Sequence, residues 1–572
     1  MLKLVLGTSG SGKTTLLYAR IRARAEAGKR SILLVPEQFT SSTEARIYRE
    51  LGDALSGMVE SYSFTSLAEH ILAIEGGAAV QTLTDAGRAV LVRRALEELQ
   101  DNVHYYYRHR RSAAFCQMAA ETIDELKSAG LSGQQLQELA RDCGTESAKL
   151  GELALIFQGY ESLLAGTGMD PADRLELAAD RLEAALARDE LPDFLREREV
   201  FIDEFDTFNA PKKRLMGAML AALPAVTVAL CEDGAPMQPG DLELFSGAKQ
   251  VAAQLRQLAR KNGAQVAAPE LLRRDLRHKD APGLAALTEL LETGSCTPPE
   301  SAPELRLFAA ASREEEARCA AAAIRRLMRQ GVRCGKIAVV CRDISLYRAA
   351  VRYEFRMAEI PLYCDEPTTP EFSTPATAVR ALLALLRGAD MTEQLTVLAK
   401  TGLCDLTEPE VCALENYAYT WSPNAAAWRA EFTKSPRGFG DAELTEEDTL
   451  NLTRAENARK KLVTAVDTLR SKVRSANAEQ ISRALYFCLK ELGAEGQQAA
   501  QVEDIRAARG IPAAEEAARE WNVVMQLLDE MASLLGQQSV TVAEYEDLFG
   551  LLLRSSDLGH IPQTLDAVVL AS

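Results

Sequence analysis

Short apolar runs alternate with helical periodicity over the first 72 residues. Three of these runs have the length of buried strands: 2–6, 31–35 and 58–64. Two stretches between them have helical spacing: 15–27 and 43–51. In the first of these, Leu17 and Ile21 share one face, and Gly28 is suited to end the helix. Strands that alternate with helices in this way predict a parallel sheet.

Helical periodicity alone continues over residues 73–195, where no strand-like run interrupts it. Apolar runs of strand length then return at 199–202 and 225–230. We therefore expect one α/β domain over residues 1–72 and 196–290, which the helical insertion at 73–195 divides in two.

A second α/β pattern begins at residues 305–308, after a linker that contains several prolines and glycines. It continues through an amphipathic helix to a strand-like run at 336–340. We expect a second α/β domain over 300–375, a second helical insertion over 376–562, and a return to the second domain at 563–572. The last run has strand character and stops with the chain, so we expect a truncated domain and a fragment of a longer protein.

A complete phosphate-binding loop follows the first apolar run. The pattern G-x-x-x-x-G-K-[ST] is matched at every fixed position by Gly7, Thr8, Ser9, Gly10, Ser11, Gly12, Lys13 and Thr14. Glycines allow backbone N–H groups to turn toward phosphate oxygens, and the following helix adds its N-terminal dipole. We expect this loop to bind ATP, with Lys13 on the β/γ-phosphates and Thr14 on Mg²⁺. The alternative is a glycine- and serine-rich turn between strand and helix that binds nothing.

An acidic pair, Asp203 and Glu204, directly follows the apolar run at 199–202. In phosphate-loop ATPases such a pair completes the site, because the aspartate supports Mg²⁺ and the glutamate activates the attacking water. We therefore expect Asp203 to be a Mg²⁺ ligand and Glu204 to be catalytic. The alternative is that this pair caps the N-terminus of the next helix.

Arg342 follows the strand-like run at 336–340 in the second α/β pattern. An arginine supplied by a second domain can stabilise charge on the γ-phosphate, so Arg342 is a second candidate catalytic residue. An ordinary surface arginine at the end of a strand is the alternative.

Aromatic and basic side chains alternate over residues 105–111, from Tyr105 to Arg111. Such a run can stack bases and neutralise phosphates of single-stranded nucleic acid. We favour the plainer interpretation, in which the tyrosines cap the ends of helices.

The composition narrows the class of protein only slightly. The chain has 572 residues, of which 47% are hydrophobic and 26% charged, as in ordinary folded proteins. A net charge of −17 argues against a uniformly basic nucleic-acid-binding surface, although it leaves room for a local basic channel. No apolar run reaches the roughly 18 residues of a membrane span, so we expect no membrane-spanning helix and no membrane partner. The 11 cysteines are scattered without C-x-x-C spacing, which predicts reduced thiols in a cytoplasmic protein and no metal cluster held wholly by this chain.

Several segments, in their order and spacing, resemble the B subunits of the AddAB (RexAB) ATP-dependent helicase–nucleases. These segments are GTSGSGKT at 7–14, LLVPEQFT at 33–40, SYSFTSLA at 61–68, FIDEFDTF at 201–208, CRDISLY at 341–347, EIPLYCDEP at 359–367 and QTLDAVVLAS at 563–572. The resemblance extends along essentially the whole chain. The phosphate loop alone is common to many proteins, whereas the VPEQ and IPLYCDEP segments are much more particular.

The resemblance implies a superfamily 1 helicase-like body, in which two RecA-like phosphate-loop domains carry large all-helical insertions. It implies one half of a heterodimer with an A subunit, acting on single- and double-stranded DNA at double-strand breaks before recombinational repair. The family also has a C-terminal nuclease domain and an iron–sulfur cluster. We expect the nuclease residues and most of the cluster ligands to lie beyond this chain.

The same resemblance implies a degenerate motor that tracks DNA and recognises the regulatory Chi sequence. Consistent with this expectation, no GD-x-x-Q-S pattern follows residues 229–234, and Gln238 lacks that context. The complete Asp203–Glu204 pair departs from the degenerate pattern and leaves room for ATP turnover.

Three functions therefore remain open at this point. The first is an ATP-binding, DNA-tracking subunit with little motor activity of its own. The second is an active, DNA-stimulated translocase that depends on Lys13 and Glu204. The third is an unrelated phosphate-loop kinase, against which the long helical insertions argue.

Overall fold

The computed structural model describes eleven stretches of the chain. They are residues 1–77, 83–110, 112–167, 169–236, 244–364, 369–440, 443–474, 476–536, 539–556, 558 and 566–571. Two compact units make up these stretches. Unit 1 comprises 1–83, 98–106 and 119–307, and unit 2 comprises 84–97, 107–118 and 308–572. The sequence analysis expected two α/β domains and two helical insertions. The boundaries of these four parts differ from those of the two units, so the four-part division stays a prediction.

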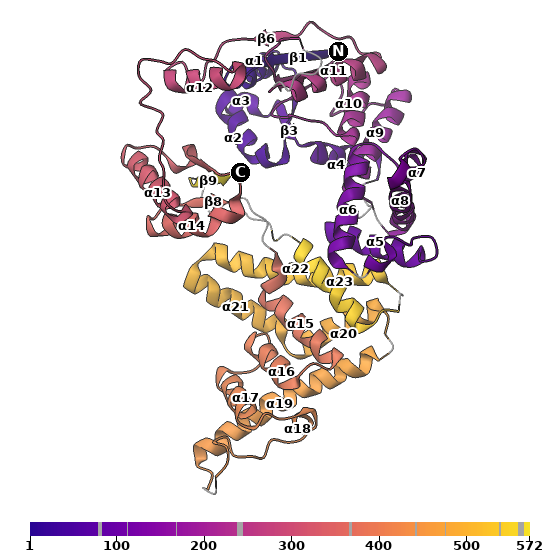
Figure 1. Cartoon of the computed structure of the whole chain (residues 1–572), viewed down its shortest axis with the longest axis vertical. Coiled ribbons are helices and arrows are strands. Elements are labelled where there is room, and N and C mark those ends of the chain that lie inside the picture. Colours follow the sequence, from indigo (N-terminus) through magenta and orange to yellow (C-terminus); the bar gives the residue numbers. More distant parts are fainter. Residues whose placement is uncertain are drawn as a thin grey trace. The chain divides into compact units, whose positions relative to one another are not determined.

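A six-stranded parallel sheet forms the centre of unit 1 (Figure 1). Its strands are β1 (Leu2–Gly7), β2 (Ser31–Leu34), β3 (Val59–Tyr62), β4 (Glu199–Ile202), β5 (Ala225–Cys231) and β6 (Glu270–Leu272). Their order is β3-β2-β4-β5-β1-β6, and every neighbouring pair is parallel. The sequence pattern therefore predicted the parallel sheet and five of its strands correctly, while the short edge strand β6 was not predicted.

Helices cover both faces of this sheet. The helices of unit 1 that pack against its strands are α1 (Lys13–Glu26), α2 (Thr40–Leu51), α3 (Asp53–Ser56), α4 (Phe64–Glu75), α9 (Pro171–Ala187), α10 (Ala210–Ala222) and α11 (Ser246–Lys261). Alternate residues of β1 face opposite ways, so Leu4 and Leu6 pack with α4, α10 and α11, whereas Val5 packs with α1 and α2. A parallel sheet buried on both faces needs continuous apolar strands, and the apolar runs found in the sequence supply them.

The remaining helices of the N-terminal half include α5 (Asp85–Glu98), α6 (Ala113–Ser128), α7 (Gly133–Ala140), α8 (Ser147–Thr167) and α12 (Pro282–Thr293). Most of α5 groups with unit 2, where the Arg94 guanidinium donates a hydrogen bond of 2.9 Å to the Leu534 carbonyl. Short 3₁₀ turns connect several of these elements: η1 (Glu37–Phe39), η2 (Tyr107–His109) and η3 (Gly144–Glu146).

Unit 2 holds a second parallel sheet, of three strands, in the order β7-β9-β8. These strands are β7 (Ala338–Val340), β8 (Leu362–Cys364) and β9 (Val568–Ala571). Helices α13 (Arg313–Arg329) and α14 (Ile344–Met357) bury one apolar cluster against them, with turn η4 (Cys334–Lys336) nearby. The strand expected from the last run is thus formed by residues 568–571, while the run's first residues, 564 and 565, lie outside the described part.

No strand forms at residues 305–308, where the sequence placed the start of the second α/β pattern. Leu307 is 99% exposed, and none of the described strands pairs with this segment. An apolar run becomes a strand only when a neighbouring strand takes its backbone hydrogen bonds, so the apolar pattern alone was misleading here.

A large helical region completes unit 2, as the periodicity over 376–562 predicted. It consists of η5 (Pro370–Phe372), α15 (Thr374–Arg387), α16 (Met391–Lys400), α17 (Glu408–Trp421), α18 (Ala425–Arg429), α19 (Glu446–Val473), α20 (Ala478–Glu491), α21 (Ala494–Arg509), α22 (Ile511–Leu535) and α23 (Val542–Ser555). Side chains cap several of these helices at their N-termini, and Thr445 and Thr541 each form a capping box.

Candidate functional site

The phosphate loop lies between the end of β1 and the start of α1. Gly10 and Gly12 adopt φ angles of +80° and +91°, which residues with a β-carbon rarely adopt. Helix α1 begins at Lys13 without a side-chain cap at its N-terminus. Because the first turn of a helix has N–H groups without intrahelical partners, this end of α1 is available to bind an anion.

Lys13 folds over the loop that precedes it. Its ammonium group donates hydrogen bonds of 2.8 Å to the Gly7 carbonyl and 2.9 Å to the Thr8 carbonyl. Burial lowers the pKa of Lys13, and the nearby Asp203 carboxylate opposes that shift. Charged phosphate oxygens are stronger acceptors than neutral carbonyls, so Lys13 is positioned to exchange these bonds for bonds to a phosphate.

Asp203 lies at the carboxyl end of β4, only 5% exposed. Its carboxylate accepts a hydrogen bond of 3.0 Å from the Glu204 N–H. Burial raises the pKa of Asp203, and the neighbouring Thr14 hydroxyl and the charges of Arg46 and Lys13 oppose that rise. The structure thus brings together the two residues that the sequence assigned to Mg²⁺.

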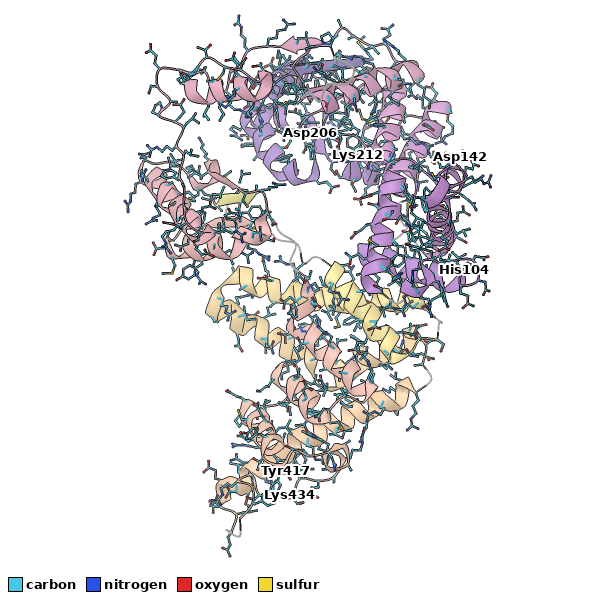
Figure 2. The ribbon with its side chains drawn as sticks, viewed as in Figure 1. His104, Asp142, Asp206, Lys212, Tyr417 and Lys434 are labelled. Atoms are coloured by element: carbon cyan, nitrogen blue, oxygen red, sulfur yellow. The ribbon has the colours of Figure 1, made fainter. Side chains whose placement is uncertain are left out.

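The acidic pair does not cap the next helix, which was the alternative interpretation. Helix α10 starts at Ala210, and the side chain of Asn209 caps it by accepting a hydrogen bond from Lys212 N–H. Two buried rings instead anchor the turn after the acidic pair, since Phe205 and Phe208 pack against Phe64. The Lys212 ammonium lies over the rings of Phe64 and Phe205, and it is labelled in Figure 2.

Glu204 has a left-handed backbone conformation with φ of +64°. For a residue with a β-carbon this costs roughly 1–2 kcal/mol, and such strain is commonly found at functional sites. Burial and the adjacent Asp203 charge raise the pKa of Glu204, while Arg46 opposes the rise. A carboxylate with a raised pKa is better suited to accept a proton from water than an ordinary glutamate.

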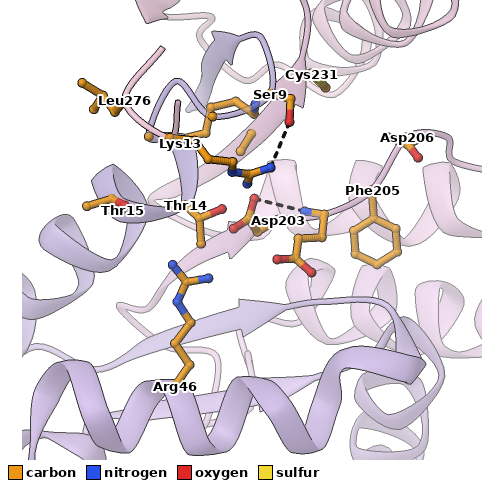
Figure 3. Close-up of a pocket in the computed structure, with 15 residues that line it drawn as sticks. Ser9, Lys13, Thr14, Thr15, Arg46, Asp203, Phe205, Asp206, Cys231 and Leu276 are labelled. Atoms are coloured by element: carbon orange, nitrogen blue, oxygen red, sulfur yellow. Dashed lines mark hydrogen bonds between the residues drawn. The ribbon is translucent and has the colours of Figure 1, made fainter. Parts of the chain in front are cut away.

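A cavity of about 530 Å³ joins the loop to the acidic pair (Figure 3). Its lining residues come from the loop after β1, from α1 and α2, from the turn after β4, from β5 and from the segment after β6: Ser9, Gly10, Gly12, Lys13, Thr14, Thr15, Arg46, Asp203, Glu204, Phe205, Asp206, Ala229, Cys231, Leu276 and Arg277. Two of these residues, Arg46 and Arg277, are cations that the sequence analysis did not identify.

The segment after β6 reaches the phosphate loop because β6 pairs with β1 at the edge of the sheet. Leu276 N–H donates a hydrogen bond of 2.9 Å to the Gly10 carbonyl, and the Arg277 guanidinium donates one of 3.2 Å to Ser9 Oγ. Asp275 holds this turn by accepting a hydrogen bond of 2.9 Å from the Arg277 N–H. Arg277 is therefore a second cation at the mouth of the loop, beside Lys13.

Arg342 lies in unit 2, at the turn between β7 and α14. There it lines a shallow hollow together with Asp343, Ile344, Ser345, Leu346 and Tyr347. Asp343 caps α14 by accepting hydrogen bonds of 2.9 Å from the Ser345 N–H and 2.6 Å from its hydroxyl. Nothing in unit 2 itself gives Arg342 a catalytic partner among the residues described, so its role stays a prediction.

The aromatic and basic run at 105–111 has a structural explanation where it is described. The backbone N–H groups of His104, Tyr105 and Tyr106 donate hydrogen bonds to the Glu152 carboxylate of α8. The Arg110 guanidinium lies 3.9 Å from the centre of the Tyr107 ring. Arg111 lies outside the described residues, as does Gln238.

The described residues contain no cluster of three or more histidine, cysteine or acidic side chains suited to a metal ion. Within the same residues, no helix combines the length and apolar character needed to cross a membrane.

Comparison with known proteins adds an independent line of evidence. Residues 4–288 match the family described as "ADDB, N-terminal". The chain is also similar to proteins named as the B subunits of ATP-dependent helicase/deoxyribonucleases. It is 31% identical to that of Moorella thermoacetica over 99% of this chain, 29% to that of Desulforudis audaxviator over 100%, and 25% to that of Clostridium acetobutylicum over 100%.

In each of these three comparisons the match covers 50% of the relative, so the chain spans about half the length of the proteins it resembles. The matches to these relatives cover both units, and the range of the family match, 4–288, contains the phosphate loop and the acidic pair. The chain therefore belongs to the AddB family, the B subunits of ATP-dependent helicase/deoxyribonucleases, and corresponds to the N-terminal half of these proteins.

Proposed function

We propose that this chain is the ATP-binding, helicase-like portion of a heterodimeric helicase–nuclease that processes DNA double-strand ends for recombinational repair. The observation that carries the proposal is the uncapped N-terminus of α1, which lies at one cavity with Lys13, Thr14 and Asp203. Family membership supports this use of the site, because relatives carry names that describe an ATP-dependent enzyme. It leaves the unrelated-kinase alternative without support.

We assign the two parallel sheets to two RecA-like domains of a superfamily 1 helicase body. The six-stranded sheet, with helices on both faces and the phosphate loop after β1, has the arrangement expected for the first domain. The three-stranded sheet would belong to the second. The helical region from α15 to α23 would then be an insertion in the second domain.

The chemistry of the site suits Mg²⁺ and a nucleoside triphosphate. A hydroxyl and a carboxylate, from Thr14 and Asp203, are oxygen ligands of the kind that Mg²⁺ takes, and Mg²⁺ commonly obtains its other ligands from phosphates and water. Bound there, the ion would neutralise charge on the β- and γ-phosphates. Lys13 would bind the same phosphates, and Glu204 would accept a proton from the attacking water.

We further propose that the motor is degenerate, that the A subunit supplies most of the translocation, and that this chain follows DNA and reads the Chi sequence. The missing GD-x-x-Q-S pattern supports the degenerate motor. The complete acidic pair Asp203–Glu204 favours the second candidate, a DNA-stimulated translocase in its own right. A cytoplasmic location and the binding of single- and double-stranded DNA follow from the same proposal. The family's nuclease and iron–sulfur residues are not assigned to this chain.

ATP turnover by the purified chain distinguishes these candidates. It is measured with and without single-stranded DNA, beside Lys13→Ala and Glu204→Gln variants. ATP binding with little or no DNA-stimulated turnover is the result expected for the degenerate motor. Turnover that DNA stimulates, and that both variants lose, would instead establish the translocase.

A further inference from the structure

Arg46 of α2 enters the same cavity as the phosphate loop, although no phosphate-binding pattern includes it. The helix is fixed in place by Ile47 and Leu51, which are buried in the core with α1 and β2. Arg46 itself is only partly buried. Figure 3 shows its guanidinium extending from α2 toward Thr14 and Asp203. A fixed backbone therefore presents a cation to the side of the cavity where the Mg²⁺ ligands lie.

Within the described residues, Arg46 forms no ion pair. It does contact Tyr18 of α1, whose ring centre lies 4.8 Å from the guanidinium carbon. Tyr18 is 6% exposed, and burial raises its pKa to about 12, so the ring stays neutral at physiological pH. A cation–π contact with a buried ring orients the guanidinium and leaves its N–H groups available to another acceptor.

The position of Arg46 relative to the other charged groups indicates which acceptor that is. Its charge acts on both carboxylates of the acidic pair, Asp203 and Glu204. These carboxylates serve the Mg²⁺ ion and the attacking water, both of which belong to the γ-phosphate end of the nucleotide. Arg277, by contrast, is hydrogen-bonded to Ser9 in the first half of the loop. The two arginines therefore approach the cavity from different sides.

We propose that Arg46 binds the γ-phosphate and makes the site selective for nucleoside triphosphates over diphosphates. This inference rests on the proposed nucleotide site and adds to it a residue from the same unit as the phosphate loop. A guanidinium can bind two phosphate oxygens at once, which a lysine cannot do with the same geometry. Arg46, and with it α2, would contact a bound nucleoside triphosphate through the γ-phosphate and would lose this contact with a diphosphate.

The test compares the affinities for Mg²⁺·AMP-PNP, a non-hydrolysable triphosphate, and Mg²⁺·ADP by isothermal titration calorimetry. Arg46→Ala is expected to weaken AMP-PNP binding about tenfold or more and ADP binding less than about threefold, because only the triphosphate loses a charge-assisted contact. Arg46→Lys should fall between the wild type and the alanine variant. Arg49, exposed and one turn further along α2, provides the matched control, and Arg49→Ala should change neither affinity.

Tyr18→Leu supplies a second variant that keeps the arginine but removes the ring that orients it. It should lower the preference for AMP-PNP by a smaller factor than Arg46→Ala does. Thermal unfolding of each variant without nucleotide shows whether the fold is retained.

Equal weakening of AMP-PNP and ADP, or no weakening of either, in a folded Arg46→Ala protein would overturn the inference and leave the nucleotide site intact. Failure of the wild type to bind either nucleotide would overturn the proposed function, and the inference with it.

Discussion

Two of the turns that lead from a parallel strand into a helix, β1–α1 and β7–α14, have helix N-termini that are built in opposite ways. Between β1 and α1 the turn contains Gly10 and Gly12 at positive φ, and no side chain caps the helix. Between β7 and α14, Asp343 caps the helix with its own carboxylate. The N-terminus of α1 can therefore bind an anion such as a phosphate, whereas the N–H groups at the N-terminus of α14 already have the Asp343 carboxylate as a hydrogen-bond acceptor.

Both turns connect a parallel strand to a helix, so this topology alone does not produce a phosphate-binding site. A helix N-terminus attracts negative charge wherever it occurs, and a single aspartate is enough to satisfy it. Glycines, a lysine and a nearby acidic pair convert the first turn into a nucleotide site.

Lys13→Ala should weaken ATP binding by roughly 100-fold, since a charge-assisted hydrogen bond contributes about 1.5–3 kcal/mol and Lys13 can form more than one. Among the described residues, the Lys13 ammonium donates hydrogen bonds only to the carbonyls of Gly7 and Thr8, so the fold should be retained. Titration with a fluorescent ATP analogue measures the affinity. The control is Lys29→Ala, an exposed lysine just past α1, which should bind as the wild type does. Equal affinity in Lys13→Ala would mean that phosphates bind elsewhere.

Asp203→Asn should lower the affinity for Mg²⁺·ATP about tenfold, because a neutral amide is a poorer ligand for the ion and most of the gain in affinity that Mg²⁺ provides is lost.

The same variant tests how the charge of Asp203 affects the stability of the fold, since burial raises the pKa of this carboxyl group in the folded chain. A raised acid pKa means that the ionised carboxylate destabilises the fold at neutral pH, and that this cost disappears as the pH falls through the folded pKa. Without nucleotide, Asp203→Asn should therefore unfold at a higher temperature than the wild type at pH 7, with a smaller difference at acidic pH. A variant that is less stable at pH 7 would contradict this sign.

Gly10→Ala should destabilise unit 1 more than Gly28→Ala does. Both glycines have positive φ, for which an alanine costs roughly 1–2 kcal/mol. A β-carbon on Gly10 would also lie 2.8 Å from the Arg277 β-carbon and 2.8 Å from Asp275 Oδ1, whereas one on Gly28 would meet nothing within 4 Å. Hydrogen exchange of the β1 and α1 amides measures the stability of this unit. Equal losses in the two variants would show that the segment after β6 does not pack on the loop.

Asp343→Ala should have the smallest effect, a modest loss of stability in unit 2 with no change in ATP affinity. The carboxylate caps α14, and Asp343→Asn should keep most of that cap. All three tryptophans, Trp421, Trp428 and Trp521, lie in unit 2, so selectively excited tryptophan fluorescence during urea unfolding reports the unfolding of this unit. Weaker ATP binding in Asp343→Ala would break the contrast between the two turns.

The phosphate loop could be predicted from the sequence because its function depends on eight neighbouring residues, Gly7 to Thr14. The buried strands β1, β2, β4 and β5 could be predicted for a similar reason, since each is a short and mostly apolar run. The sequence also placed Asp203 after a strand. Its contact with Thr14 depends on β4 and β1 lying on either side of β5, which no local pattern shows.

Arg46 and Arg277 could not be predicted because long-range packing brings them to the cavity. Arg277 reaches Ser9 only because the three-residue strand β6 pairs with the edge of β1. Arg46 lies on an amphipathic helix, where an arginine is an ordinary residue. The mistaken expectation at 305–308 has the opposite cause, because there an apolar pattern exists without a neighbouring strand.

Hydrogen–deuterium exchange of the purified chain, with and without Mg²⁺·ATP, tests most directly the claim that unit 1 is the nucleotide site. We predict slower exchange of the backbone amides over residues 8–15 and at Glu204, with no change over 341–347, which includes the turn that Asp343 caps. Unchanged exchange over 8–15 at saturating Mg²⁺·ATP, or protection found only over 341–347, would contradict it.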